Sequence, residues 1–234
     1  MEEILLAFEQ VTGTRGKFRL QNISFALPAG YIMGLMGVNG AGKTTLMNYI
    51  MKEKAGYKGT IKIAGQDMKQ DDGKLKNIIG LVSEENRFLN ERTAAQNVEI
   101  LSGFYEDFDK EIFRSAMETM GVSGNLTYGK MSRGEKLKFQ MAFAMAHHAR
   151  LYLLDEVTVG MDPVFRMDFF RLLQRIIGDG QCSVLMTSHI ESEMEQKTDY
   201  VGILERGSLV RFGESMDIIP QLKEEREADG NETE

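Results

Sequence analysis

Apolar and polar positions alternate along most of the chain with two periods, one typical of strands and one typical of helices. The apolar run Ile32–Met36 predicts a buried strand, and the run 151–154 predicts another, as in the centre of a parallel sheet. The expected strands cover residues 3–10, 18–27, 32–36, 59–64, 77–82, 151–154, 183–186, 200–205 and 208–212. The expected helices cover residues 44–54, 132–148, 163–177 and 190–196. Strands that alternate with helices in this way are typical of an α/β fold.

The pattern changes between residues 84 and 131, where helical periodicity continues and strand signals are few. Apolar stripes at helical spacing cover 93–104 and 109–120. Asp109 is the expected N-cap of the second stripe, and Gly121 is its expected stop signal. We therefore expect an α-helical subdomain over residues 84–131.

The rest of the chain is expected to form one core from two segments, 1–83 and 132–220, with the helical subdomain inserted between them. A short turn joins the first two expected strands, which predicts a small antiparallel β subdomain at the start of the core. Residues 221–234 hold six acidic residues against Lys223 and Arg226. We expect this last segment to be a flexible acidic tail.

The residues with the clearest chemistry directly follow the expected strand 32–36. The stretch GVNGAGKTT, residues 37–45, matches G-x-x-x-x-G-K-[ST] between a strand and a helix. Its glycines let successive N–H groups point inward around an anion, and the helix start adds partial positive charge. Lys43 would reach the β- and γ-phosphates, and Thr44 would bind Mg²⁺. The alternative is a glycine-rich turn that only caps a helix. The residues expected to contact a nucleoside triphosphate are Asn39, Gly40, Ala41, Gly42, Lys43, Thr44 and Thr45.

Two acidic residues and a histidine follow two other expected strands. Asp155 and Glu156 end the apolar strand 151–154, where Asp155 can hold Mg²⁺ through water. Glu156 can polarise a water for attack on the γ-phosphate. His189 follows the strand 183–186 and can hydrogen-bond the γ-phosphate and the attacking water. Lys43, Glu156 and His189 are therefore the expected catalytic residues, against the alternatives of an acidic strand end and a structural histidine.

The helix expected over 132–148 begins with Ser132, and Glu135 follows three residues later. This spacing is that of a capping box, in which each side chain accepts a hydrogen bond from the other residue's backbone N–H. A helix start with a serine and a glycine, here Gly134, is also an anion site. It would hold a phosphate that the glycine-rich loop of the same chain does not reach.

Composition narrows the choice of function. The 234 residues carry a net charge of −7 with a pI near 5.2, which argues against broad nucleic-acid binding. The single cysteine, Cys182, cannot form an internal disulfide, which indicates a reducing compartment. The stretch MEEILLAF lacks the basic region of a secretory signal, and no apolar run reaches the about 18 residues of a membrane span. We therefore expect a cytoplasmic protein that reaches a membrane only through a partner.

Five motifs in order give the chain, over residues 3–213, a resemblance to the nucleotide-binding subunit of ABC transporters. GVNGAGKTT resembles the Walker A motif, LYLLDE the Walker B motif, MSRGE the signature, VGMD the D-loop and TSH the switch histidine. The segment 128–163 is most similar to exporters of drugs, bacteriocins and antibiotics. The resemblance implies a P-loop NTPase core of the RecA-like type.

The resemblance also implies how such a protein works. Two subunits, identical or different, would form a head-to-tail dimer around two ATP molecules and hydrolyse them with Mg²⁺. Ser132, Gly134 and Glu135 would contact the ATP bound to the partner, and Asp162 would couple the two sites. The dimer would drive separate integral membrane permease subunits from the inner face of the cell membrane.

Two other functions remain open at this stage. One is an ATPase switch on a ribosome, DNA or Fe–S assembly machinery, and the other is a regulatory ATP-binding module without catalysis. One cassette, an acidic balance and the lack of coiled-coil arms favour transport. A membrane helix would contact the segment 84–104, with Phe88 and Leu89 either as its apolar contacts or as core of the helical subdomain.

Three positions depart from the family pattern. Glu84 stands where the family usually has glutamine, and its carboxylate can still bind Mg²⁺, which prefers hard oxygen ligands. Arg133 stands where the strict signature has glycine. The aromatic residue that stacks on adenine is usually a tyrosine, and here Phe18 is expected in that role, with the planar guanidinium of Arg15 as the alternative.

Overall fold

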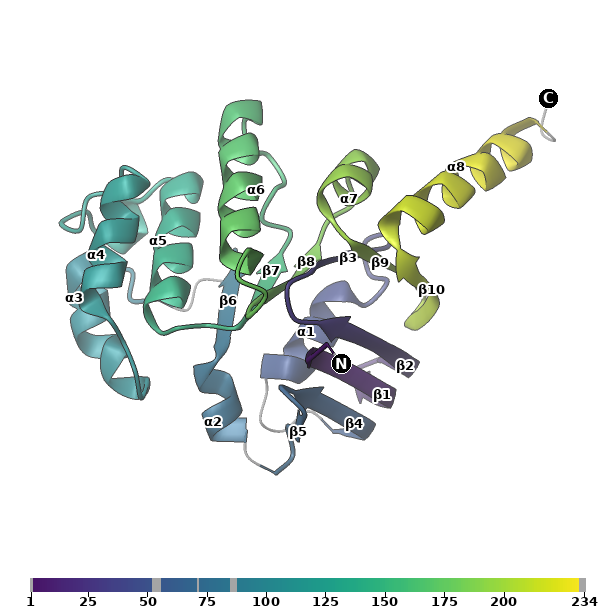
Figure 1. Cartoon of the computed structure of the whole chain (residues 1–234), viewed down its shortest axis with the longest axis horizontal. Coiled ribbons are helices and arrows are strands. Elements are labelled where there is room, and N and C mark those ends of the chain that lie inside the picture. The colour runs from purple at the N-terminus through teal and green to yellow at the C-terminus, as the bar shows by residue number, and fades with distance from the viewer. Residues whose placement is uncertain (1, 52–55, 71, 85–87, 232–234) are drawn as a thin grey trace.

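The fold is organised by one twisted mixed sheet with helices packed against it (Figure 1). The computed structural model describes residues 2–51, 56–70, 72–84 and 88–231. In this part of the chain the sheet has ten strands, in the order β5-β4-β1-β2-β10-β9-β3-β8-β7-β6. The strands are β1 (Ile4–Arg15), β2 (Phe18–Pro28), β3 (Ile32–Met36), β4 (Tyr57–Ile63), β5 (Gln66–Asp67), β6 (Ile79–Ser83), β7 (Leu151–Asp155), β8 (Ser183–Thr187), β9 (Tyr200–Glu205) and β10 (Ser208–Glu214). The helices are α1 (Lys43–Met51), α2 (Asp72–Asn77), α3 (Ala94–Leu101), α4 (Lys110–Thr119), α5 (Arg133–Ala146), α6 (Pro163–Ile177), α7 (Glu191–Lys197) and α8 (Ser215–Asn231), with short 3-10 turns at Ser102–Phe104 and Tyr128–Lys130.

The sheet has an antiparallel part and a parallel part. β1 pairs antiparallel with β2, as the alternating pattern and the short turn predict, and it also pairs antiparallel with β4. β3 pairs parallel with β8 and β9, and β7 pairs parallel with β6 and β8. Because successive side chains of a strand point to opposite faces, the apolar strand β3 contributes to two cores. Met33 and Leu35 pack with α1, whereas Ile32 and Met36 pack with α5, α6 and α7.

The helical subdomain has its own apolar core. Residues of α3, α4 and α5 form a separate cluster that includes Val98, Phe113 and Phe139. Asp109 caps α4 by accepting hydrogen bonds from two backbone N–H groups, and Gly121 follows the helix with a φ of +70°, so both predicted end signals are confirmed. Helix α5 belongs to both regions, since one of its faces packs in this cluster and another packs on the parallel sheet.

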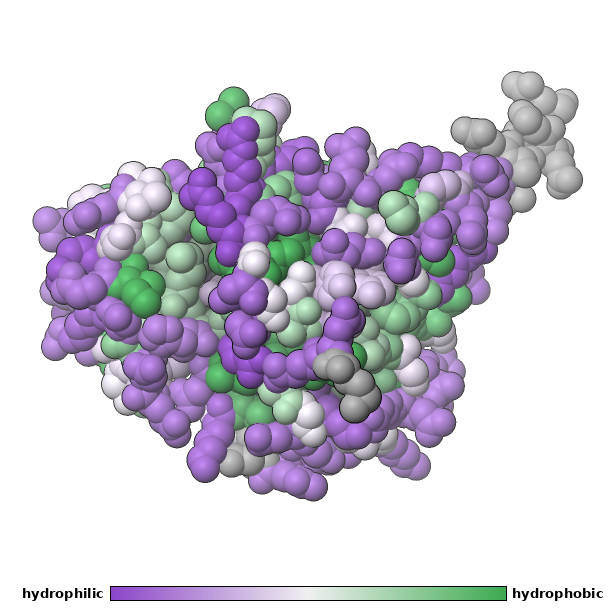
Figure 2. Space-filling view, in the orientation of Figure 1, coloured by the Kyte–Doolittle hydropathy of each residue, from purple (hydrophilic) through white to green (hydrophobic). Residues whose placement is uncertain are grey.

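The helical subdomain and α6 do not pack tightly against each other. On the face seen in Figure 2, apolar residues gather between these two parts of the molecule. A pocket of about 570 Å³ between α4 and α6 is lined by Ile112, Met120, Met145, Leu172 and Ile176. The helical subdomain therefore meets the core largely through α5. The subdomain boundaries at 84 and 132 remain a prediction.

One expectation about secondary structure is wrong. Residues 221–231 continue helix α8 instead of forming a flexible tail, and 232–234 lie outside the described residues. The helix is held by Ile219, which is buried in the core beside α7, and by an ion pair of 2.6 Å between Lys223 and Glu195. The acidic composition of residues 221–234 gave no indication of this apolar contact, so a tail was predicted. Residues 52–54 of the first expected helix lie outside the described part.

Candidate functional site

The functional side chains meet where three parallel strands end together. Ser83, Asp155 and Thr187 occupy the same register position on β6, β7 and β8. The Thr187 hydroxyl donates to Asp155 Oδ1 at 2.7 Å and accepts from the backbone N–H of Glu156 at 2.9 Å. Residues directly after these positions, including Glu84 and Glu156, therefore leave the sheet at one edge. Thr187 was not among the predicted site residues, although its position at the end of a buried strand before His189 was a usable signal.

The glycine-rich loop joins β3 to α1 at this same edge. Gly37 has a φ of +153°, and a Cβ there would lie 2.4 Å from the carbonyl oxygen of Leu204. Gly42 has a φ of +118°, and a Cβ there would lie 2.8 Å from the ring of Phe18. Both positions require glycine for backbone conformation and for space. The loop is thus packed on β9 at one end and on Phe18 at the other.

Lys43 and Glu156 lie next to each other in the structure. The Lys43 side chain is 5% exposed, and its ammonium donates to the carbonyl of Gly37 at 2.7 Å. The same Nζ lies 3.7 Å from Glu156 Oε1. Glu156 has a φ of +51°, a left-handed conformation that is uncommon for a residue with a side chain. The structure therefore brings the predicted phosphate-binding lysine and the predicted water-orienting carboxylate to one place.

The other residues of the predicted ATP site surround this pair. Asn39, Gly40 and Thr44 are exposed on the loop and the first turn of α1, while Ala41 and Gly42 are buried and Thr45 is half-buried.

His189 is exposed and lines a pocket of about 320 Å³ together with Gly37 and Val38 of the loop. Phe18 lies beside Gly42, so of the two adenine-stacking candidates it is the one that contacts the loop. Arg15 is exposed at the turn between β1 and β2.

A buried carboxylate connects the segments that carry the predicted residues. Glu193 on α7 accepts hydrogen bonds from Thr158 at 2.8 Å and from Ser188 at 3.1 Å. Its other oxygen lies 3.3 Å from Nε of Arg166, an ion pair without hydrogen-bond geometry at these two atoms. The loop after β7, the loop after β8 and α6 are thus joined around one side chain. Glu193 was not among the predicted residues, because a glutamate in a short polar helix has the same pattern as a solvated residue.

Helix α5 begins with the predicted capping box. The Ser132 hydroxyl accepts from the N–H of Glu135 at 3.2 Å, and the N–H of Ser132 donates to Glu135 Oε2 at 2.8 Å. The hydroxyl also donates to the same carboxylate at 2.7 Å, and these bonds lower the pKa of Glu135. Asp162 caps α6 by accepting from the N–H groups of Val164 and Phe165 at 3.1 and 3.0 Å.

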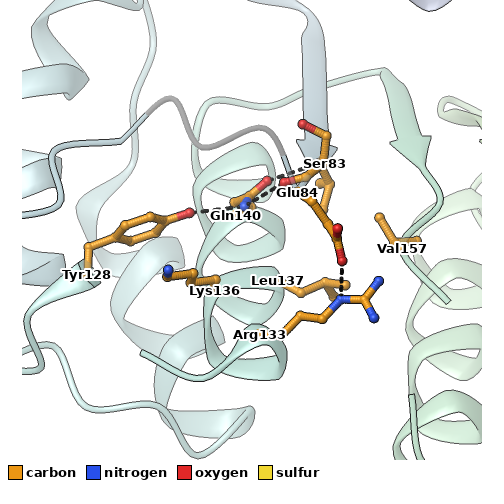
Figure 3. A pocket seen from close by; sticks show the side chains of 9 residues that line it. Ser83, Glu84, Tyr128, Arg133, Lys136, Leu137, Gln140 and Val157 are labelled. Atoms are coloured by element: carbon orange, nitrogen blue, oxygen red, sulfur yellow. Dashed lines mark hydrogen bonds and ion pairs between the residues drawn. The ribbon is translucent and has the colours of Figure 1, made fainter. Parts of the chain in front are cut away.

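Glu84 and Arg133, the two departures from the family pattern, form an ion pair. Glu84 Oε1 lies 2.5 Å from Nε of Arg133 at the edge of a pocket of about 330 Å³ (Figure 3). Gln140 lines the pocket and binds Ser83 through both of that residue's backbone groups, at 2.9 and 3.1 Å. Both charged residues were predicted as departures from the family pattern, but their pairing was not predicted.

Mg²⁺ fits the oxygen atoms that the site offers. Asp155 uses Oδ1 for Thr187, which leaves Oδ2 for a metal or its water, and the Thr44 side chain is exposed. The described residues contain no group of three or more His, Cys, Asp or Glu that could hold a metal. Mg²⁺ needs no such group, because it usually takes one or two protein ligands together with phosphates and water.

A glycine-rich loop between a buried strand and a helix, with an acidic strand end beside its lysine, defines a P-loop nucleotide-binding protein. The family described as ABC transporter matches residues 20–159. The chain belongs to this family.

Relatives and solved structures agree with this assignment. The chain is 32% identical over 206 residues to the ABC transporter ATP-binding protein YtrB of Bacillus subtilis, covering 88% of this chain and 69% of that protein. It is 29% identical over 211 residues to the bacitracin transport ATP-binding protein BcrA of Enterococcus faecalis, covering 89% and 68%. The solved ATP-binding subunit of an ABC transporter matches with a TM-score of 0.82 at 21% identity, covering 94% and 93%.

The chain is therefore the ATP-binding subunit of an ABC transporter, with an ABC ATPase fold. Several of its relatives are transport or resistance ATP-binding proteins by name, among them the linearmycin resistance ATP-binding protein LnrL of Bacillus subtilis, at 29% identity. Among the described residues, no helix has the length and apolar character needed to cross a membrane.

Proposed function

We propose that this subunit binds and hydrolyses Mg²⁺-ATP in a head-to-tail dimer and drives a separate membrane permease that exports its cargo. The observation that carries the proposal is the 3.7 Å contact between Lys43 and Glu156 at the end of the parallel strands. Hydrolysis of a γ-phosphate requires a cation that binds the phosphate and a group that orients the attacking water, and Lys43 and Glu156 would supply these at one place.

Each residue has a defined part in this reaction. Lys43 and the backbone N–H groups of the loop bind the phosphates, and Phe18 stacks on adenine. Glu156 orients the attacking water, and His189 contacts the γ-phosphate across the pocket that it shares with the loop. Asp155 and Thr44 would hold Mg²⁺, and the Glu84 oxygen that does not pair with Arg133 would be a further ligand. Bound Mg²⁺ neutralises charge on the phosphates.

The dimer supplies the remaining contacts. Ser132 and Gly134 contact the γ-phosphate bound to the other subunit, and Glu135 lies beside Ser132 in the same site. Asp162 couples the two sites. The partner subunit is either a second copy of this chain or a related ATPase subunit. The permease holds the assembly at the cytoplasmic face of the cell membrane.

A groove beside the helical subdomain suits a permease helix. A pocket of about 340 Å³ between the end of β6 and this subdomain is lined by Phe88, Leu101, Phe104 and Tyr105, and Phe104 is 78% exposed. Phe88 also packs on rings inside the subdomain, so it belongs to the subdomain core as well as to the pocket. Leu89 is exposed near this groove. Two relatives are named for bacitracin transport and linearmycin resistance. Resistance to an antibiotic is consistent with its removal from the cell, so we favour export over import.

Hydrolysis is tested with an epitope-tagged Glu156→Gln variant. The change keeps the shape of the side chain and removes the carboxylate charge that orients water. We expect ATP binding to persist and turnover to fall by about 100-fold, within the range typical of a positioned general base. The measurements are ATP affinity and phosphate release for the purified parent and variant.

Glu118→Gln is the matched control, since Glu118 is an exposed glutamate on α4 away from the loop. Equal turnover in parent and Glu156→Gln would remove Glu156 from this role. To distinguish transport from the other functions, the epitope-tagged parent protein is isolated from gently solubilised cells and the proteins that accompany it are identified. A membrane protein of several spans supports the permease, whereas ribosomes, DNA or a soluble assembly factor would overturn transport.

A further inference from the structure

The guanidinium of Arg133 joins three segments that are far apart in the sequence (Figure 3). Arg133 is the first residue of α5, and its Nε pairs with Glu84 directly after β6. Its Nη2 donates to the carbonyl of Glu156 at 3.3 Å, and its Nη1 donates to the carbonyl of Val159. The start of the signature helix is therefore bound to the loop that follows the Walker B strand.

The loop after β7 is shaped to receive this guanidinium. Gly160 has a φ of +71°, and a Cβ there would lie 2.9 Å from Nη1 of Arg133. A planar guanidinium can donate to two carbonyls on one side and to a carboxylate on another, which an ammonium group cannot match in a fixed geometry. The contact is therefore specific to arginine at position 133.

The backbone of Glu156 is held from both ends by this arrangement. Its N–H donates to Thr187, and its carbonyl accepts from Arg133. The left-handed conformation at a φ of +51° is uncommon for glutamate, and such conformations persist only where the surroundings hold them. Because a peptide unit is rigid, fixing these two groups also directs the Glu156 side chain.

The ion pair itself contributes little to stability. The side chains of Arg133 and Glu84 are 42% and 65% exposed, and exposed ion pairs have small net effects on folding. The role of Glu84 in the pair is geometric, because it holds the guanidinium in the position that reaches the two carbonyls. A glutamine at 84 and a glycine at 133 would make neither contact.

We propose that Arg133 is a positioning residue for ATP hydrolysis, which holds the Glu156 backbone from the start of α5, and that Glu84 keeps Arg133 in place. The inference rests on the proposed role of Glu156. It makes the orientation of Glu156 depend on where the signature helix lies, since movement of α5 breaks the contact. The two departures from the family pattern then act as one unit.

The test uses the full-length protein and the kinetics of ATP hydrolysis. Arg133→Ala is expected to lower kcat by about tenfold, as misplacement of a reacting group does, while KM for ATP and the Tm change little. Arg133→Lys is expected to keep kcat low, because an ammonium group cannot reach both carbonyls and Glu84 in the same geometry. Arg114→Ala is the matched control, because Arg114 forms an exposed pair with Glu111 at 2.6 Å on α4, outside the site.

The double replacement Glu84→Arg with Arg133→Glu separates the ion pair from the positioning. It rebuilds the pair with reversed charges, but the new carboxylate at 133 cannot donate to the carbonyls. We therefore expect kcat to stay low even at saturating Mg²⁺, which offsets the loss of Glu84 as a proposed metal ligand. Full activity in this variant, or in Arg133→Ala, would overturn the inference and leave the proposed function intact. If the parent itself does not hydrolyse ATP, the proposed function fails first. In a Glu156→Gln background, Arg133→Ala is expected to have no further effect, and an additional loss would contradict the inference.

Discussion

The two helix starts that were predicted as anion sites, those of α1 and α5, are built in opposite ways. Helix α1 begins at Lys43 after Gly42, a residue with no side chain, so the N–H groups of its first turn are not capped by the residue before them. Helix α5 begins after Ser132, whose capping box with Glu135 satisfies that end from within the chain.

The difference shows what each end can do without a partner. At α1 a buried ammonium and a packed glycine-rich loop are already in place around the expected phosphates. At α5 the carboxylate of Glu135 occupies the position beside Ser132 that an anion would take, and Arg133 is held by Glu84. Helix α1 therefore offers a site made by one chain, whereas α5 has to exchange internal contacts before it can hold a phosphate.

The largest expected effect comes from breaking the α1 site. Lys43→Ala removes the buried ammonium that contacts the Gly37 carbonyl and Glu156, and with it part of the positive charge that would neutralise the phosphates. We expect ATP turnover to fall on the order of 100-fold or more, as when a preorganised donor is removed from a reacting site. Phosphate release and ATP binding by the purified variant are the measurements.

Lys62→Ala is the control for that change. Lys62 pairs with Glu9 at 2.7 Å on the antiparallel strands, and its side chain is partly exposed. Turnover that falls equally in both variants would mean that loss of a cation acts through folding or net charge. The contrast between α1 and α5 would then lose its basis.

Local sequence pattern was enough to predict the α1 site. Strand Ile32–Met36, the loop and the lysine follow one another in the chain, and their geometry depends on short-range backbone constraints. The parallel strands also followed from their apolar runs, and with them the shared edge of Asp155 and His189. The acid and the histidine were therefore predictable as candidates.

Contacts between distant segments could not be predicted in this way. Glu84 and Arg133 are 49 positions apart, and periodicity tells which face a residue lies on but not which side chain it meets. The cap of α5 was predictable because both of its partners lie within one turn. Glu193 and Thr187 bind groups from other strands and helices, so only the tertiary structure reveals their contacts.

A smaller effect, on stability, is expected when the pH is lowered, and it comes from a histidine at the C-terminal end of α5. His147 ends the helix, lies 2.9 Å through Nδ1 from the Asn77 carbonyl, and stacks on Tyr105. Burial lowers the pKa of His147 from 6.5 to about 4, assisted by the charge of His148 and opposed by the bond to Asn77. The unfolded chain thus binds a proton between these pH values while the folded chain does not. The free energy of unfolding should fall by about 2 kcal/mol between pH 7 and pH 5 from this group.

Denaturant unfolding at the two pH values measures this change. In His147→Gln the side-chain amide can still donate to the Asn77 carbonyl but does not titrate, so the difference between pH 7 and pH 5 should shrink. His148→Gln is the comparison, because His148 is about half exposed and contributes only a minor part of the His147 shift, so it should change the difference less than His147→Gln does. An undiminished difference in His147→Gln would show that other groups cause the acid sensitivity.

The smallest expected effect on stability distinguishes capping from phosphate binding at α5. Ser132→Ala and Asp109→Ala each remove the N-cap of one helix, at a cost of about 1 kcal/mol of folding free energy. Only Ser132 is proposed to contact the partner's ATP, so turnover should fall about tenfold in Ser132→Ala alone, as when a hydrogen bond to a charged group is lost. Equal turnover in the two variants, at equal loss of stability, would reduce Ser132 to a cap. The Ser132 side chain would then have no part in binding the partner's phosphate.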